Sequence, residues 1–246
     1  SSGFPYLDEK RLDYAKSRMT WLKSFLKDEK APLPEPKTYA KDEAIISTLS
    51  KEAYLETVQK TIDYIYAGDI FEANITQRFK APFDKNDAYP LYQRLRKVNA
   101  APFSAFVNFD ETVLASASPE RFIQMQDKHV ETRPIKGTRK RDLQNPSRDL
   151  ALGEELLASI KDRAENIMIV DLMRNDLSRV CKPFTVKEPQ LCGLESFATV
   201  HHLVSCVVGD LKDEKDTVDL LKATFPGGSI TGAPKIRAME IIDELE

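Results

Sequence analysis

The sequence predicts an α+β fold built around one main domain. Segments with strand character and segments with helical periodicity occur in separate runs, without the regular strand–helix alternation of a doubly wound sheet. No internal repeat divides the 246 residues. With 41% hydrophobic and 30% charged residues, the composition is that of an ordinary folded domain, which excludes a disordered or low-complexity chain.

The first part of the chain is predicted to be helical and then extended. Apolar residues recur at roughly helical spacing through residues 9–30. Pro32, Pro34 and Pro36 follow, and they prevent helix continuation and favour extended chain. We therefore expect residues 1–40 to be the remnant of an N-terminal region with a proline-rich linker, and the main domain to span residues 41–246.

The main domain is predicted to open with a helix and to continue as groups of strands and helices. Tyr54, Val58 and Ile62 share one helical face, and Gly68 is suited to end that helix. Asp110 and Glu111 separate two strand-like runs, which indicates a β-hairpin. Strands are predicted over 71–81, 103–109, 112–118, 121–125, 129–135, 185–191 and 201–211, and helices from about 87 to 98, over 145–178 and 217–223, and from 236 onwards.

Charge and hydropathy exclude several classes of protein. The net charge is −3 and the pI about 5.8, so no cationic field is present to hold a nucleic acid. The apolar runs fall far short of the ~20 residues that a membrane span needs. Cys181, Cys192 and Cys206 are odd in number and form no CxxC pair, so we expect small buried thiols in a reducing compartment. We expect a cytoplasmic protein that binds neither nucleic acid nor membrane.

A glycine-rich stretch opens a helix at residues 227–235. Glycines let backbone N–H groups approach an anion, and a helix N-terminus favours negative charge. The stretch is not a Walker A loop, because Lys235 does not directly follow the last glycine and no Ser or Thr comes after it. Two interpretations stay open: an ordinary tight turn, or a loop that binds a carboxylate.

Five cations crowd into residues 133–141, with Lys136 among them. Crowding of this kind favours the neutral amine, which is a nucleophile, although most lysines in such runs are solvated surface groups. Asp162 and Glu165 lie three residues apart on one helical face and could hold Mg²⁺, or they could pair with Lys161 and Arg163.

The adjacent histidines His201 and His202 lie in a strand-like run. Successive side chains of a strand point to opposite faces, so the two rings cannot share one metal ion. We expect one of them to face a pocket.

Six segments occur in one order from residue 67 to the end: AGDIFEANITQRF, SPERF, ETRPIKGT, AENIMIVDLMRNDLSRVC, HHLVS and PGGSITGAPKIRAMEIIDELE. Together they resemble the chorismate-utilising enzymes, a family that includes anthranilate synthases, aminodeoxychorismate synthases and isochorismate synthases. The resemblance implies an α+β fold of two large sheets packed orthogonally, with flanking helices around one active site. Within the family, the PIKGT form around Lys136 resembles the aminodeoxychorismate branch, whereas anthranilate synthases have PIAGT.

The resemblance implies a covalent mechanism. Neutral Lys136 would attack C2 of chorismate while the C4 hydroxyl departs, and ammonia would then add at C4 and expel the lysine, giving 4-amino-4-deoxychorismate. Glu120 matches the family acid that protonates the departing hydroxyl, and burial in a pocket would raise its pKa for that task.

The resemblance also implies a binding site for substrate and metal. Glu165 matches a Mg²⁺ ligand, and Asp162 falls at a second acidic position near the ion. His202 matches a substrate-site histidine, which leaves His201 as structural. The substrate contacts implied by the remaining motifs are Thr138, Gly228, Ser229 and Thr231, with Lys235 as a weaker cation at the helix start.

Glu72 departs from the family pattern. The resemblance implies Gln at this position in the branch and Lys, acting as a base, in isochorismate synthases. Two interpretations of Glu72 stay open: it is a tolerated substitution at the surface, or it changes how the site handles the incoming nucleophile.

The family pattern extends beyond both ends of this chain. We therefore expect residues 41–246 to be a chorismate-binding catalytic domain truncated at its C-terminus, without a substrate arginine and a second Mg²⁺-binding glutamate. The function implied is amination of chorismate for p-aminobenzoate and folate synthesis, in a heterodimer with a glutamine amidotransferase that supplies ammonia. The alternatives are anthranilate synthase component I and a non-catalytic module that binds chorismate or the glutaminase.

Overall fold

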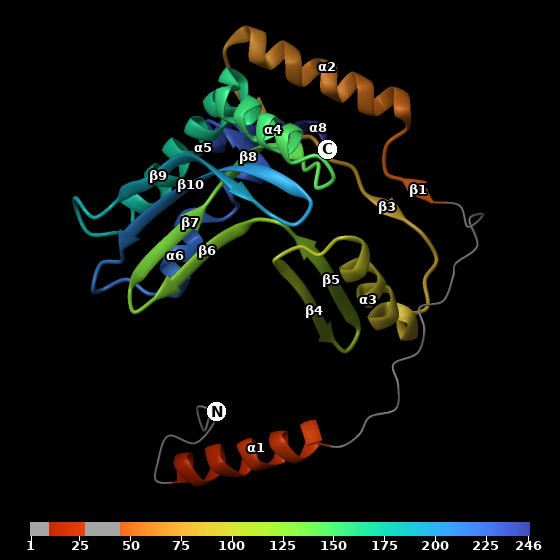
Figure 1. The fold of residues 1–246 in the computed structure, drawn as a ribbon, viewed down its shortest axis with the longest axis vertical. Helices are drawn as coiled ribbons and strands as arrows, with labels where there is room; N and C mark the ends of the chain where they lie inside the picture. The colour runs from red at the N-terminus through yellow and green to blue at the C-terminus, as the bar shows by residue number, and fades with distance from the viewer. Residues whose placement is uncertain (1–9, 28–44) are drawn as a thin grey trace. The chain divides into compact units, whose positions relative to one another are not determined.

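The computed structural model describes residues 10–27 and 45–246 and divides the chain into two compact units, 1–38 and 39–246 (Figure 1). In the first unit, helix α1 (Lys10–Lys27) confirms the helical region predicted near the N-terminus. The predicted proline-rich linker and the boundary at residues 40 and 41 lie outside the described residues.

A five-stranded antiparallel sheet forms the centre of the second unit. Strand β10 (Val200–Asp210) has β9 (Lys187–Ser196) along one edge. Along its other edge run β8 (Ile135–Lys140) and then β7 (His129–Arg133), which pairs with β6 (Arg121–Gln126). Pro134 separates β7 from β8, because it lacks the N–H that a continuous strand would need, and its carbonyl accepts from Ser205 N at 3.1 Å.

Two helices, α4 (Pro146–Ala158) and α5 (Ile160–Ser178), pack against this sheet (Figure 1). The helical region predicted over 145–178 is confirmed and divides at Ser159, which is extended and whose side chain caps α5 by accepting from Asp162 N at 3.3 Å. Asn145 caps α4 in the same way. The core lies between α5 and the sheet and contains Val130, Ile169, Val170, Met173, Leu177, Val207 and Leu211.

From residue 45 to residue 81 the chain forms one long helix and three short strands. Helix α2 (Lys51–Ala67) ends as predicted at Gly68, whose φ of 85° is left-handed. The single strand predicted over 71–81 is wrong: only β2 (Glu72–Ala73) and β3 (Phe79–Lys80) form, and they pair with different partners. Strand β3 joins β1 (Ile46–Ser47), whereas β2 joins β11 (Gly232–Ala233).

The predicted hairpin is confirmed as β4 (Phe103–Phe109) and β5 (Thr112–Ser118), with α3 (Ala88–Val98) packed on it after a short 3₁₀ turn, η1 (Lys85–Asp87). The C-terminal part contains α6 (Thr217–Thr224), a four-residue helix α7 (Gly228–Thr231), and α8 (Lys235–Leu245). The α+β class is confirmed; the described strands assemble one five-stranded sheet and three two-stranded pairs. The three cysteines are free and buried, as expected.

Gly232 determines how closely β11 approaches β2. Its φ is 144°, and a Cβ at this position would lie only 2.0 Å from the backbone oxygen of Glu72. Glycine alone fits such a contact, since any side chain would push the two strands apart. The pairing therefore fixes Glu72 beside the glycine-rich segment.

Candidate active site

Strand β8 carries the predicted nucleophile, Lys136, which meets a carboxyl group from a distant part of the chain. Lys136 Nζ lies 2.7 Å from Glu72 Oε1, and the two side chains are only 16% and 21% exposed. Lys136 also lies close enough to Glu120 for its charge to lower the pKa of that carboxyl. The Lys136 amine thus pairs with a carboxyl group from a remote segment, and Glu120 lies near enough to be affected by its charge.

The Glu120 carboxyl is in a position suited to an acid. It accepts a hydrogen bond from Ser229 Oγ at 2.6 Å and another from the backbone of Ile135. Burial raises its pKa, outweighing the opposing effects of these two donors and of the Lys136 charge. The raised pKa expected for a proton donor is therefore present, and Ser229 is the residue that orients the group.

A cavity of about 410 Å³ adjoins Glu120. This volume falls in the range of ~300–1,000 Å³ that is typical of small-molecule sites. Its walls are mostly apolar, with Glu120 and Ser229 among the polar groups that face it. The lining residues are Ser118, Pro119, Glu120, Phe122, Thr132, Met173, Phe225, Gly227, Gly228, Ser229 and Ile230.

The glycine-rich segment, residues 227–235, contributes close backbone packing to the site more than it contributes charge. Gly228 packs on α5, where a Cβ would lie 2.1 Å from a methyl carbon of Leu172. The buried Thr231 hydroxyl donates to the Gly227 carbonyl at 3.1 Å, which leaves it no proton for a substrate carboxylate.

Lys235 does not act as a free cation at the start of α8, contrary to prediction. Its amine pairs with the buried carboxylate of Asp176 and donates to the Thr224 carbonyl at 3.0 Å. Its charge is therefore neutralised inside the protein, and an anion at this helix start would find no cation there.

Thr138 and His202 lie together on neighbouring strands. His202 Nδ1 is 2.8 Å from Thr138 Oγ1, and the Phe197 ring packs edge-on against the imidazole with centroids 5.4 Å apart. Burial lowers the pKa of His202, so the ring is neutral near pH 7 and can accept or donate one hydrogen bond. Both residues were predicted to contact substrate, and the structure brings them to the same strand pair as Lys136.

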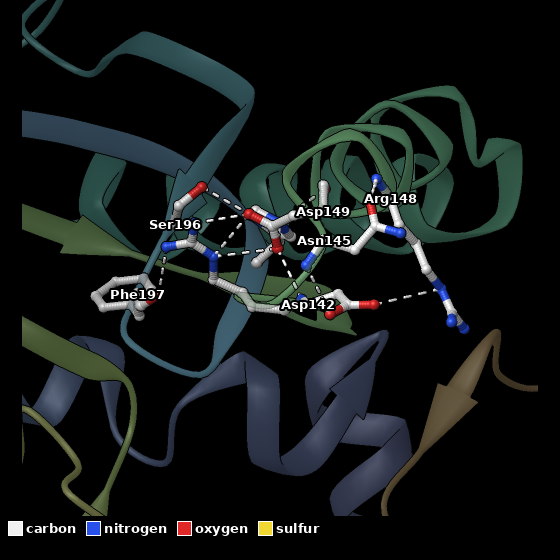
Figure 2. A network of polar contacts seen from close by, with 8 residues as sticks. Asp142, Asn145, Arg148, Asp149, Ser196 and Phe197 are labelled. Atoms are coloured by element: carbon white, nitrogen blue, oxygen red, sulfur yellow. Dashed lines mark hydrogen bonds and ion pairs between the residues drawn. The ribbon is translucent and has the colours of Figure 1, made fainter.

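His201, in contrast, contacts Asp149 and Ser196, which belong to a polar network at the end of β8 (Figure 2). Its ring contacts Ser196 Oγ at 2.7 Å and Asp149 Oδ1 at 3.1 Å. Arg141 donates to Asp149 at 2.7 Å, and the backbone N–H of Asp142 adds another donor at 2.9 Å. The hydrogen bond from Arg141, supported by the other donors, lowers the pKa of Asp149 to about 2. His201 therefore has the surroundings of a structural residue, as expected.

The two predicted metal ligands lie one turn apart on α5. Asp162 packs against Gly137, and a Cβ atom added at residue 137 would lie 2.8 Å from the Asp162 Cβ. The Asp162 carboxylate accepts a hydrogen bond from Arg139 at 3.3 Å. Glu165 has only a loose contact with Lys161, at 3.8 Å. No group of three or more His, Cys, Asp or Glu suited to a metal occurs in the described part of the chain. Asp162 and Glu165 both carry the hard oxygen donors that Mg²⁺ prefers, and that ion commonly keeps several water ligands.

The sequence left the role of Glu72 open and did not single out Asn74. Glu72 was left between a surface role and a role toward the nucleophile, and its ion pair with Lys136 favours the second. Asn74 was not considered, although its side chain donates to the Ser229 carbonyl at 3.3 Å and ties β2 to the glycine-rich segment. Its place inside the FEANITQRF motif was the available signal.

The fold and this constellation define a chorismate binding enzyme: the chain belongs to that family, whose pattern matches residues 5–246. A curated relative, aminodeoxychorismate synthase component 1 of Salmonella typhimurium, is 47% identical over 94% of this chain. Anthranilate synthase component 1 of Aquifex aeolicus is 42% identical over 81% of it. The crystal structure of anthranilate synthase component I from Streptococcus pneumoniae covers 98% of the chain with a TM-score of 0.80 and 31% identity.

The chain spans about half the length of these proteins: 49% of the Salmonella protein, 40% of the Aquifex protein and 52% of the Streptococcus chain. Among the described helices, none combines the length and the apolar character needed to cross a bilayer.

Proposed function

We propose that this chain carries the chemistry of an aminodeoxychorismate synthase: amination of chorismate at C4 by ammonia, through a covalent intermediate on Lys136. The observation that carries the proposal is the half-buried amine of Lys136, paired with Glu72 and near enough to affect Glu120, a carboxyl that lines a cavity suited to a small molecule. The 47% identity to a relative named aminodeoxychorismate synthase component 1 supports the same branch.

In the proposed reaction, Lys136 and Glu120 divide the work. The neutral amine of Lys136 attacks C2, the double bond shifts, and the C4–O bond breaks as Glu120 protonates the departing hydroxyl to water. Ammonia then forms a bond to C4, the double bond shifts back, and the C2–N bond to lysine breaks. The raised pKa of Glu120 supports its role, because the carboxyl must be protonated before the hydroxyl leaves.

The other polar residues bind and orient the substrate. Ser229 holds the Glu120 carboxyl, while Thr138 and His202 offer hydrogen bonds on the neighbouring strands. Glu165 and Asp162 would hold a Mg²⁺ ion, which would supply positive charge to a substrate carboxylate. Asp162 would have to release its ion pair with Arg139 when the ion binds.

We further propose a partner and a compartment. The relatives' name, component 1, supports a second subunit, and a glutamine amidotransferase would supply ammonia for this reaction in p-aminobenzoate and folate synthesis. Three buried free thiols support the reducing cytoplasm as the site of action.

Product analysis tests this function. The 246-residue chain and the full-length protein are each incubated with chorismate, Mg²⁺ and ammonium, and products are identified by mass spectrometry. We expect 4-amino-4-deoxychorismate without pyruvate, and loss of about 10³-fold or more in Lys136→Ala. Anthranilate with pyruvate would instead support the activity named in the Aquifex relative. Binding without any product would support a non-catalytic module.

A further inference from the structure

The side chain of Asn74 lies where strand β2 meets the glycine-rich segment. Its Nδ2 atom is 3.3 Å from the Ser229 carbonyl oxygen, 3.5 Å from the Thr231 carbonyl oxygen and 3.4 Å from Glu72 Oε1. All three atoms are acceptors, so the amide presents its N–H₂ group to them and not its oxygen. The last carbonyl groups of a helix lack partners within the helix, and Asn74 donates to two of these in α7.

The backbone of Asn74 is held independently of its side chain. Asn74 N donates to the Thr231 carbonyl at 2.8 Å. At the other end of β2, Phe71 N donates to the Ala233 carbonyl, also at 2.8 Å. These two bonds flank the pairing of β2 with β11, so removal of the side-chain amide would leave the strand pairing in place and act on Ser229.

Ser229 connects this amide to the Glu120 carboxyl. Its carbonyl accepts from Asn74, and its hydroxyl donates to Glu120 Oε1 at 2.6 Å. The oxygen that carries no proton is the better acceptor of a protonated carboxyl, so this bond favours the proton on Oε2. Movement of Ser229 away from Glu120 by about 1 Å would lengthen the contact beyond hydrogen-bond range.

We propose that Asn74 is a positioning residue: by holding the Ser229 carbonyl, it keeps the Ser229 hydroxyl on Glu120 and so orients the acid. This inference rests on the proposed function, in which Glu120 protonates the departing hydroxyl. Asn74 exchanges no proton in this role, and its effect on the reaction passes through Ser229.

The surroundings of Glu120 determine how loss of this hydrogen bond would change its titration. In the described part of the chain, Lys136 on β8 is the charge that acts on Glu120, and Glu72 of β2 is paired with that lysine. The donors to Glu120 are the Ser229 hydroxyl and the Ile135 backbone. The Ser229 donor lowers the pKa of Glu120 against the larger effect of burial, so its loss should raise this pKa further. The cavity walls from β7 and α5 contribute two uncharged side chains, Thr132 and Met173.

A double-mutant cycle in the full-length protein tests the proposal, with saturating chorismate and Mg²⁺ and a constant concentration of free ammonia. Asn74→Ala should lower kcat by about 10-fold with KM changed less than about threefold, and Ser229→Ala should lower kcat at least as much. The double variant should be no slower than Ser229→Ala, because both changes remove the same hydrogen bond to Glu120. Asn74→Asp has the same shape without the N–H donor and should lose as much as Asn74→Ala.

The pH profile of kcat separates positioning from general damage to the fold. The rate should fall at alkaline pH as Glu120 ionises, and in Asn74→Ala this fall should move to higher pH although the maximum rate is lower. Asn145→Ala is the matched control, because the Asn145 side chain caps α4. Its urea midpoint should decrease, while its kcat and pH profile should stay at the wild-type values.

The outcomes for Asn74 and for the reaction are distinguishable. An unchanged kcat in Asn74→Ala, a loss of kcat with an unmoved pH profile, or losses that multiply in the double variant would each overturn the role of Asn74 and leave the amination intact. Failure of the wild-type protein to form 4-amino-4-deoxychorismate would instead overturn the proposed function.

Discussion

Asp149 and Glu120 are both partly buried carboxyl groups, and they lie near opposite ends of β8. Asp149 is surrounded by donors: the Arg141 guanidinium, the Asp142 N–H and the His201 ring (Figure 2). Glu120 has one hydroxyl donor and one backbone donor, and it adjoins a cavity. The pKa of Asp149 is lowered to about 2, whereas that of Glu120 is raised.

The contrast separates a structural carboxylate from a reactive one. Where charged and backbone donors saturate a carboxylate, their stabilisation of the ionised form outweighs the cost of burial. Where donors are few, the cost of burial outweighs their effect and the pKa is raised. Strand β8 therefore has a carboxyl group with a lowered pKa near one end and one with a raised pKa near the other, and four substitutions test that division.

Glu120→Gln should produce the largest effect. Without its proton donor, the amination rate should fall by about 10²–10⁴-fold, measured as kcat with chorismate and ammonium. Gln keeps the acceptor for Ser229, so the fold should be retained, and circular dichroism provides the control. A rate within tenfold of wild type would remove Glu120 from the reaction.

Glu120→Gln should lower the reaction rate but raise the free energy of unfolding at neutral pH. Because the folded-state pKa of Glu120 is raised, its favourable contribution is present below its ordinary value of 4.5 and is lost as pH rises through the folded pKa. Glu120→Gln should therefore be more stable than wild type in urea at pH 7–8, and the difference should vanish near pH 4.

Asp149→Asn should have the second largest effect, on stability. The folded-state pKa is lowered from 3.8 to about 2, so the contribution of Asp149 is present above its ordinary value and is lost as pH falls toward 2. Urea unfolding at pH 7 should show a clear destabilisation that shrinks as pH approaches 2. An equal loss at both pH values would mean that packing, not charge, explains the effect.

Substitution of the two histidines, His201 and His202, should have the smallest effects. His201→Gln should lower the free energy of unfolding by about 1–3 kcal/mol, because Ser196 and Asp149 lose a buried partner. His202→Gln should change it by less than about 1 kcal/mol and should instead raise KM for chorismate. Equal stability losses in both variants, with unchanged KM, would contradict the assignment of His202 to the substrate site.

Local signals explain which parts of the fold were predictable. Gly68, Asn145 and the turn at Asp110 act within a few residues, and the elements that they bound were found. Strand β8 was missed because its cationic residues hide the alternating pattern, and its partner β10 lies more than 60 residues further on. The segment 71–81 was predicted as one strand because its two real strands are defined only by remote partners.

The motifs pointed to candidate residues but not to their pairings. Lys136, Glu120 and His202 were proposed from motifs, and the structure places them on or beside β8 and β10. The contact of Glu72 with Lys136 depends on the pairing of residues 72 and 233, which no local pattern reports. Lys235 was misjudged for the same reason, since its partner Asp176 lies on another helix.

The central claim is that Lys136 is the nucleophile and that Glu120 is the acid that protonates the departing hydroxyl. The most direct test is peptide mass mapping of the full-length protein mixed with chorismate and Mg²⁺ in the absence of ammonia. We predict an adduct on Lys136 with the mass of chorismate less one water, absent in Lys136→Ala and discharged to 4-amino-4-deoxychorismate when ammonium is added. Product formation by Lys136→Ala at the wild-type rate would contradict the claim.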